Sequence, residues 1–163
     1  MRIDAVVINA SPLITLFCSG QADLLPRLFR FSHIVAPEAV WYEVTVAEKE
    51  DFAARELGKQ SWPLRKSVVL SPRVEEWALG AGETAVLSYA LANPTLRAVI
   101  DDRAARRCAQ TLSIPFLGTG ALLVLAKRRG LLASVNEGLE KLRQSGLWLS
   151  DDIVQLLKAQ AGE

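Results

Sequence analysis

The sequence predicts an α/β protein with a mostly parallel central sheet. Short apolar runs rich in β-branched residues alternate with segments of helical spacing, and brief turns of Gly, Pro, Asn or Asp separate them. The 163 residues, 50% hydrophobic and 23% charged, suit a folded globular chain and exclude disorder, collagen and coiled coil. No repeat or linker divides the sequence, so we expect one domain over 1–163, with C-terminal helices over 134–163.

The first half of the chain is predicted to alternate between strands and helices: a strand over 3–9, helices from Leu13 and over 22–29, a strand over 33–36, and a helix opened by Pro37. Ser11 and Pro12 are the expected N-cap and first residue of the first helix. Pro26 should shorten the second helix. The polar stretch 47–66 is expected to be a helix end followed by a loop.

The second half continues the same alternation, in this order: helical turns over 74–79, a helix over 83–91, a strand over 96–100, a helix over 103–112, a strand over 114–117, and helices over 121–129, over 135–144 and from Asp151. The segment Gly80-Ala-Gly82 is expected to separate two helices. Ser150 is the expected N-cap of the last helix.

The amino-acid composition limits which side chains can form a functional site. The net charge of +1 does not indicate a protein whose whole surface binds polyanions. The two cysteines, Cys18 and Cys108, lie far apart, so we expect no disulfide scaffold or structural zinc site, and a cytoplasmic location. With His33 as the single histidine, carboxylates are the obvious catalytic groups. Asp4 and the Asn9–Pro12 interruption argue against a signal peptide, and no apolar run approaches the roughly 20 residues of a membrane span.

Polar residues directly follow two of the predicted strands. Others lie on the predicted helices beside these strands. Asn9 and Ser11 follow the first strand, and the Asp101-Asp102 pair follows a later one. Glu43 and Glu83 lie on neighbouring helices. Because the carboxyl ends of parallel strands form the ligand-binding edge of an open sheet, these carboxylates can converge there around Mg²⁺ or Mn²⁺. Such ions support hydrolysis of a phosphodiester.

Each of these residues also has a purely structural interpretation. Glu83 can complement a helix dipole, and the Asp pair can cap the next helix and bind Arg106. Glu43 suits the polar face of a helix, and Asn9 with Ser11 suits a turn. A phosphotransfer receiver domain also places carboxylates at strand ends, but it needs an early acidic pair where this chain has Asn9.

Five segments in order resemble the PIN-domain family, and specifically a PIN-like branch of prokaryotic proteins allied to the VapC-type toxin ribonucleases. The segments span nearly the whole chain: Val6-Val-Ile-Asn-Ala-Ser-Pro-Leu-Ile14, Pro37-Glu-Ala-Val-Trp-Tyr-Glu-Val44, Gly82-Glu-Thr-Ala-Val-Leu87, Val99-Ile-Asp-Asp-Arg-Ala-Ala-Arg106 and Ile114-Pro-Phe-Leu-Gly-Thr119.

The resemblance implies a three-layer sandwich and an acidic cluster that binds Mg²⁺ or Mn²⁺ and cleaves RNA. It also implies an antitoxin partner and a homodimer. The metal ligands carried over are Asn9, Glu43, Glu83 and Asp101 or Asp102, the acids among them being catalytic, with Ser11 beside the substrate. Asn9 departs from the family pattern, which usually has Asp there. The alternative is therefore a PIN-like module that binds RNA or protein without cutting. Thr119 matches a Gly-Thr turn with no assigned role.

Basic residues supply candidate phosphate contacts. Residues 101–130 hold six Lys or Arg against two Asp, and Arg103 and Arg106 follow the Asp pair directly, which marks them as candidates for substrate binding. The cations at 127–129 are equally explained by their favourable interaction with the dipole at a helix C-terminus. Among the four tryptophans, Trp62 in the polar stretch is the best candidate for an aromatic that faces a partner.

Overall fold

Five parallel strands form the central sheet of the computed structural model, which describes residues 5–29, 33–46 and 52–163. Along the sheet the order is β3-β2-β1-β4-β5, so that the first strand lies in the middle. The strands, in chain order, are β1 Val6–Ile8, β2 Ile34–Pro37, β3 Pro63–Lys66, β4 Arg97–Val99 and β5 Phe116–Leu117. The register places Ile8 of β1 opposite Val99 of β4, so the two strands end side by side.

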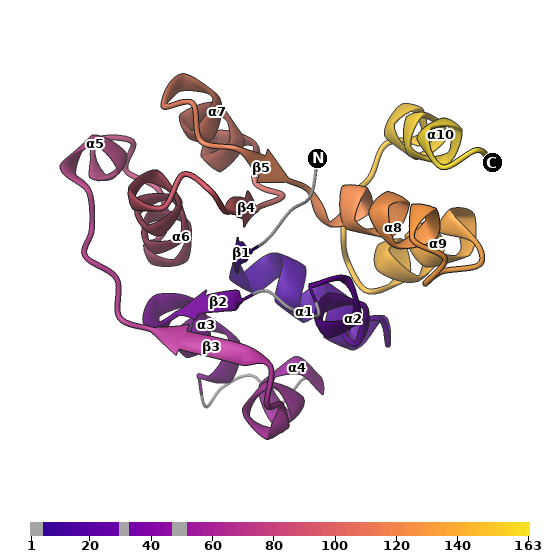
Figure 1. Cartoon of the computed structure of the whole chain (residues 1–163), viewed down its shortest axis with the longest axis horizontal. Helices are drawn as coiled ribbons and strands as arrows, with labels where there is room; N and C mark the ends of the chain where they lie inside the picture. Colours follow the sequence, from indigo (N-terminus) through magenta and orange to yellow (C-terminus); the bar gives the residue numbers. More distant parts are fainter. Residues whose placement is uncertain (1–4, 30–32, 47–51) are drawn as a thin grey trace.

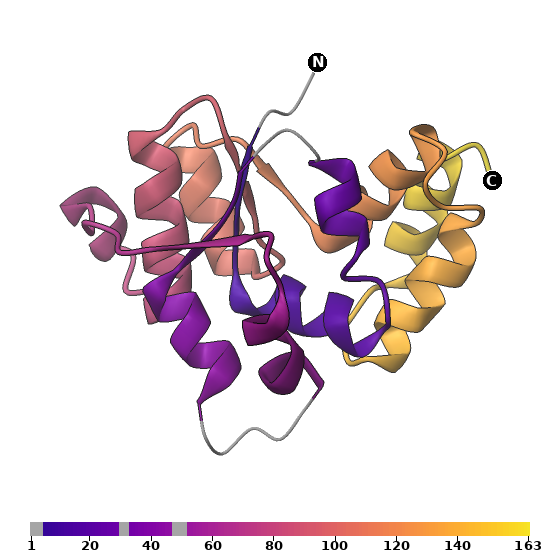
Figure 2. The same cartoon turned by 60° about the horizontal axis from the view of Figure 1, so that its bottom comes forward.

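Helices cover both faces of this sheet. In Figure 1 the strands form a column with α6 on one side and α1, α2 and the C-terminal helices on the other, and Figure 2 shows the last three helices grouped at one end of the molecule. The helices of the described residues are α1 Ala10–Cys18, α2 Leu24–Leu28, α3 Glu38–Thr45, α4 Phe52–Glu56, the 3-10 turn η1 Leu57–Lys59, α5 Pro72–Glu75, α6 Ala81–Ala92, α7 Arg103–Thr111, α8 Thr119–Arg128, α9 Val135–Gln144 and α10 Asp151–Gln160. The predicted α/β fold class is confirmed.

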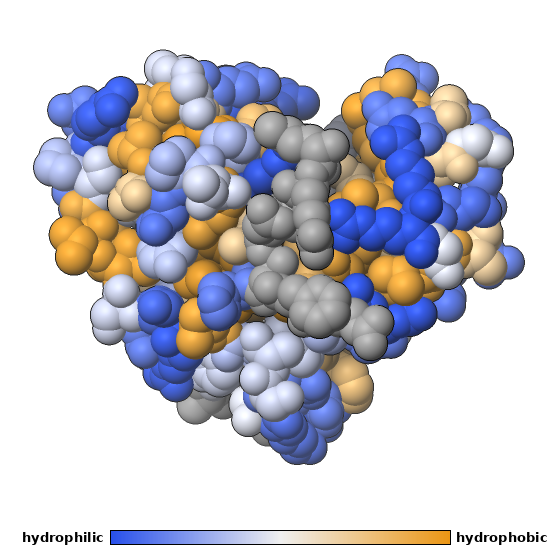
Figure 3. Space-filling model, in the orientation of Figure 1, coloured by the Kyte–Doolittle hydropathy of each residue, from blue (hydrophilic) through white to orange (hydrophobic). Residues whose placement is uncertain are grey.

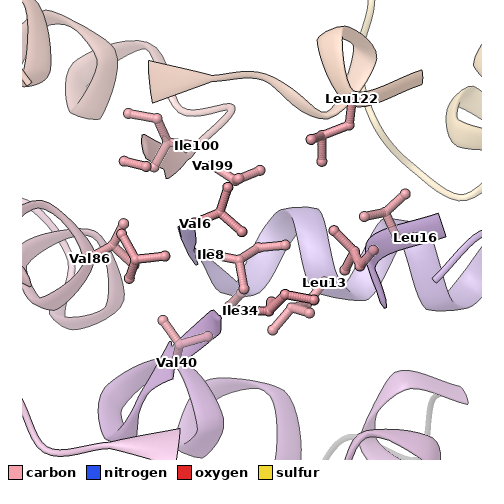
Figure 4. Packing of buried hydrophobic residues seen from close by; sticks show 14 of the residues in the cluster. Val6, Ile8, Leu13, Leu16, Ile34, Val40, Val86, Val99, Ile100 and Leu122 are labelled. Carbon is pink, nitrogen blue, oxygen red and sulfur yellow. The ribbon is translucent and has the colours of Figure 1, made fainter. Parts of the chain in front are cut away.

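The core is built around β1. Val6, Val7 and Ile8 have no exposed surface, because strands inside a parallel sheet are covered on both faces. Helix residues from both layers, among them Leu13 and Val86, meet these strand residues in one apolar cluster (Figure 4). Outside the core, apolar and polar residues are mixed over the face in Figure 3. Within the described residues no helix is long and apolar enough to span a membrane.

Several predicted boundaries are wrong, three of them near the candidate functional residues. The first helix begins at Ala10, not at Leu13, with Asn9 at the N-cap position in extended conformation. Pro12 lies inside its first turn, where a missing N–H costs no helical hydrogen bond. Pro37 ends β2, and the following helix begins at Glu38. Gly82 does not separate two helices but lies in the first turn of α6.

The sequence predicts a helix end followed by a loop over 47–66. Residues 47–51 lie outside the described part of the chain, and beyond them the predicted loop is wrong. The rest forms α4, η1 and the edge strand β3. Leu64, Arg65 and Lys66 are exposed, so β3 lacks the apolar pattern that predicts a strand. Its pairing with β2, Val35 opposite Leu64, places it in the sheet.

Candidate metal centre

The carboxyl ends of β1 and β4 lie next to each other at one edge of the sheet. The residue after β1, Asn9, donates its backbone N–H to the carbonyl of Val99, the last residue of β4. Asp101 follows β4 two positions later. Helix α6 packs against β1, β2 and β4, so its N-terminal turn, which carries Gly82 and Glu83, is positioned by the same strands. The sheet therefore holds together residues that lie 74 positions apart in sequence.

Asn9, Glu43 and Glu83 converge around Gly82. The Asn9 Nδ2 donates a hydrogen bond of 3.0 Å to Glu83 Oε1, and the Gly82 N–H donates one of 2.9 Å to Glu43 Oε1. A Cβ at Gly82 would lie 2.7 Å from Glu43 Oε1 and 2.9 Å from Asn9 Oδ1. Both oxygens thus lie close to the position that a Cβ would take, so a side chain at residue 82 would force at least one of them to move.

The Asn9 amide has one satisfied and one unsatisfied end. Its side chain is 2% exposed, and Oδ1 has no hydrogen-bond partner in the protein. The Glu83 carboxylate can only accept, so the amide must turn its N–H₂ toward Glu83 and its oxygen toward Glu43. A buried polar oxygen left without a partner costs about 1–3 kcal/mol. Such an atom marks a place where a cation or a donor is expected to bind.

These donors fit a hard divalent cation. Asn9 Oδ1 and the Glu43 and Glu83 carboxylates offer oxygen ligands, which Mg²⁺ and Mn²⁺ prefer. Among the described residues no group of three or more His, Cys, Asp or Glu side chains is placed to hold a metal. Together with the amide oxygen of Asn9, the two carboxylates offer a set of three oxygen donors with two negative charges.

Asp101 lies against the start of α8. Its Oδ1 accepts the Thr119 N–H at 2.9 Å, and its Oδ2 accepts the Thr119 hydroxyl at 2.6 Å. Arg106 Nη2 lies 3.5 Å from Oδ1. Thr119 is fully buried, so Asp101 holds the first turn of α8 to the end of β4. This contact also explains why the helix predicted from residue 121 begins at Thr119.

Asp102 turns the other way and caps α7. Its Oδ2 accepts the Ala105 N–H at 2.8 Å, and the residue is exposed. The capping interpretation of Asp102 and the pairing of Asp101 with Arg106 are both confirmed. The convergence of all five predicted ligands on one cation remains a prediction: a hydrogen bond joins Asn9 to Glu83, and Glu43 is held to the same helical turn by the Gly82 N–H.

A sequence model described as a PIN domain matches residues 5–163 of the chain. The chain belongs to the PIN-domain family. No curated protein matches it. The family gives the chain a nuclease-type fold, and PIN domains typically use Mg²⁺ or Mn²⁺. The match leaves the resemblance to the VapC-type branch as a prediction.

The predicted substrate residues lie around the same edge of this PIN domain. Ser11 is exposed in the first turn of α1, and Arg103 is exposed in the first turn of α7. Arg106 is more constrained: its Nε donates to the Ile100 carbonyl at 3.2 Å, and its guanidinium lies 5.8 Å from the Phe116 ring centroid. Its side chain is 39% exposed, which leaves part of the guanidinium open to a phosphate.

Two residues that matter to the PIN-domain site had no assigned role in the sequence analysis. Gly82 admits the oxygens of Asn9 and Glu43, and Thr119 binds both oxygens of Asp101. A glycine directly before the candidate ligand Glu83 and a threonine in the Gly-Thr turn were the available signals. Neither signal identifies its partner, because that partner comes from a distant part of the chain.

Proposed function

We propose that this PIN domain is an Mg²⁺- or Mn²⁺-dependent endoribonuclease, and that it is the toxin of a toxin–antitoxin pair. The observation that carries the metal-dependent activity is the buried, unpartnered Asn9 Oδ1 beside the Glu43 and Glu83 carboxylates. The choice of RNA, the antitoxin partner and the homodimer come from the family resemblance and are part of the proposal.

In the proposed mechanism the chain's own residues hold and orient the reacting groups. Glu43 and Glu83 hold the cation, with the Asn9 amide oxygen as a neutral ligand. The Gly82 N–H fixes the Glu43 carboxylate, and the Asn9 Nδ2 fixes that of Glu83. A divalent cation held there would supply activation of a water molecule and neutralisation of charge on the scissile phosphate.

In the proposal two arginines contact the RNA, and the two aspartates position these arginines. Arg103 and Arg106 position the RNA backbone, because guanidinium groups bind phosphate through paired hydrogen bonds. Asp101 orients Arg106 and the start of α8. Asp102 places Arg103 by capping α7. In the proposal both aspartates also contribute negative charge near the cation.

A second candidate function is a PIN-like module that binds RNA or protein without turnover. The observation that favours it is that each site carboxylate already accepts a hydrogen bond from the protein: Glu83 from Asn9, Glu43 from Gly82, and Asp101 from Thr119. These three carboxylates therefore have hydrogen-bond partners without a cation. Asn9 also lowers its negative charge by one, which weakens attraction for a metal.

Calorimetric titration of Mn²⁺ and Mg²⁺ separates the two candidates when it is followed by an RNA cleavage assay. Glu83→Ala should abolish metal binding and Mn²⁺-dependent cleavage of a fluorescent RNA. Glu137→Ala is the matched control, since Glu137 is also an acidic residue in a helix's first turn but is exposed on α9. Metal binding unchanged in Glu83→Ala would overturn the site. Binding without cleavage would favour the non-catalytic module.

The toxin role has its own test in cells. Expression of the native chain should arrest growth, and expression of Glu83→Ala at the same level should not. Arrest by both chains would show that toxicity does not depend on the proposed nuclease site.

A further inference from the structure

Trp62 lies in a small pocket at the opposite end of α1 from Asn9. Its ring stacks on that of Phe17, with centroids 6.1 Å apart and an interplanar angle of 15°. Asn9 precedes α1 and Phe17 lies in its last turn, so the two sites are about 12 Å apart along the helix at 1.5 Å per residue. The Trp62 pocket is therefore separate from the candidate metal centre.

The Trp62 pocket has aromatic walls and a volume of about 240 Å³. Phe17 and Trp62 line it, and Phe52 from α4 lines it with 46% of its surface exposed. Gly20 also lines it, and a Cβ there would meet nothing within 4 Å. Small-molecule sites usually measure about 300–1,000 Å³, so this pocket suits a single inserted side chain.

The charged residues that line the Trp62 pocket are both acidic. Glu56 is 26% exposed and Asp23 is 71% exposed. Each has a cation nearby on the surface: Lys59 Nζ lies 3.1 Å from Glu56, and Arg27 lies 3.8 Å from Asp23. Such exposed pairs contribute only about 0–1 kcal/mol, so an incoming cation can replace them.

The same chemistry already holds an arginine elsewhere on this chain. The Arg65 guanidinium lies 5.0 Å from the Trp41 ring centroid, and its Nε donates to both Glu38 carboxylate oxygens at 2.9 Å. A tryptophan face beside a carboxylate therefore suits a guanidinium, which stacks on aromatic rings and pairs with carboxylates in one plane. The Trp62 pocket offers these groups without a resident arginine among its lining residues.

We propose that the Trp62 pocket receives an arginine side chain from a partner protein. The guanidinium stacks against Trp62 and Phe52 while Glu56 and Asp23 accept its N–H groups. This inference does not depend on nuclease activity, since no lining residue belongs to the candidate metal centre.

The probe is N-acetyl-arginine amide, with N-acetyl-citrulline amide as its neutral isostere. Titration is followed by ¹H–¹⁵N NMR, with the Trp62 indole N–H as the reporter. We expect the arginine probe to shift this resonance with a Kd on the order of 1–10 mM, as for one side chain held by a few contacts. The citrulline probe should produce no shift, and added salt should weaken arginine binding.

Glu56→Gln tests the role of charge without removing an aromatic wall, and it should weaken arginine binding at least about threefold. Trp62→Ala should abolish binding, and because this variant lacks the reporter indole, its titration is followed through the backbone N–H of Gly20, which also lines the pocket. Trp148→Ala is the matched control because Trp148 is 79% exposed outside the pocket. Equal binding of arginine and citrulline would overturn the proposal, as would an affinity that Glu56→Gln leaves unchanged. Loss of the arginine-induced shift in Trp148→Ala would do the same.

Discussion

Asn9→Asp tests the arrangement of the metal centre most directly. In the native chain Asn9 Nδ2 donates to Glu83 Oε1 across 3.0 Å, and the Asn9 side chain is 2% exposed. The substitution replaces this donor by a carboxylate oxygen. Two negative charges about 3 Å apart repel by roughly 5 kcal/mol at an effective dielectric constant near 20. The metal-free variant should therefore be less stable than the native protein.

Protonation limits this loss of stability. Holding a proton at pH 7 on a carboxyl of ordinary pKa about 3.9 costs about 4 kcal/mol, which is less than the repulsion. The introduced carboxyl then has a higher pKa in the folded state than in the unfolded state. Its destabilising effect is large at neutral pH and falls as the pH drops toward the ordinary carboxyl pKa of about 4. We expect a loss of up to about 4 kcal/mol at pH 7 and about 1.5 kcal/mol at pH 5.

Thermal unfolding in EDTA measures the effect. These losses correspond to a drop in Tm of roughly 8–16 °C at pH 7 and 3–6 °C at pH 5. Added Mn²⁺ should reduce the difference in Tm between the variant and the native protein, because a divalent cation offsets two of the three negative charges of the variant's site. Asn93→Asp is the control, since the Asn93 amide donates to a carbonyl, that of Tyr89, and not to a carboxylate. A variant as stable as the native protein at pH 7, or an equal gap at both pH values, would refute the reasoning.

Three further substitutions test other contacts. Thr119→Val removes the 2.6 Å hydrogen bond to Asp101, and urea unfolding should show a loss of about 1.5–3 kcal/mol, as expected for a hydrogen bond to a charged group. Gly82→Ala should weaken Mn²⁺ binding more than about tenfold with little change in stability, because its Cβ separates Asn9 from Glu43 while alanine favours the helix. Backbone N–H groups of Asn136 and Val135 lower the pKa of Glu163 to about 2. Glu163→Gln should therefore reduce the Tm at pH 6, and the difference from the native protein should disappear as the pH falls toward 2.

Clear outcomes would contradict each of these expectations. An unfolding free energy unchanged by Thr119→Val would show that the Asp101 contact does not hold α8. Undiminished Mn²⁺ affinity in Gly82→Ala would place the cation away from Gly82. A Tm difference for Glu163→Gln that persists at pH 2 would mean that the Glu163 carboxylate is not the source of the stabilisation.

The sequence predicts most of this fold because its strong elements carry local signals. The strand at Val6–Ile8 is continuously apolar, and Ser150 precedes α10 as its N-cap. The edge strand β3 could not be predicted, because its exposed Arg65 and Lys66 follow no apolar alternation and only pairing with β2 places it in the sheet. Tertiary contact decides such a strand, not local preference.

In the candidate site, too, some features follow from local sequence and others depend on tertiary contacts. Asn9, Glu43 and Glu83 were identifiable from their positions at strand ends and on neighbouring helices. The contacts that distinguish Asp101 from Asp102 were not, since the sequence does not reveal that Thr119 would bind one carboxylate while the α7 N-terminus binds the other. Spacing along the chain identifies candidates, whereas their partners depend on the packing of distant helices.

The central position of β1 has a consequence for how the protein is made. This strand leaves the ribosome first, but one of its two partners, β4, begins at Arg97. The Asn9–Glu83 contact likewise spans 74 residues. Because such long-range pairings form late, a nascent chain that ends before residue 83 has no assembled metal centre. Under the proposed function, such an incomplete chain would not cleave RNA.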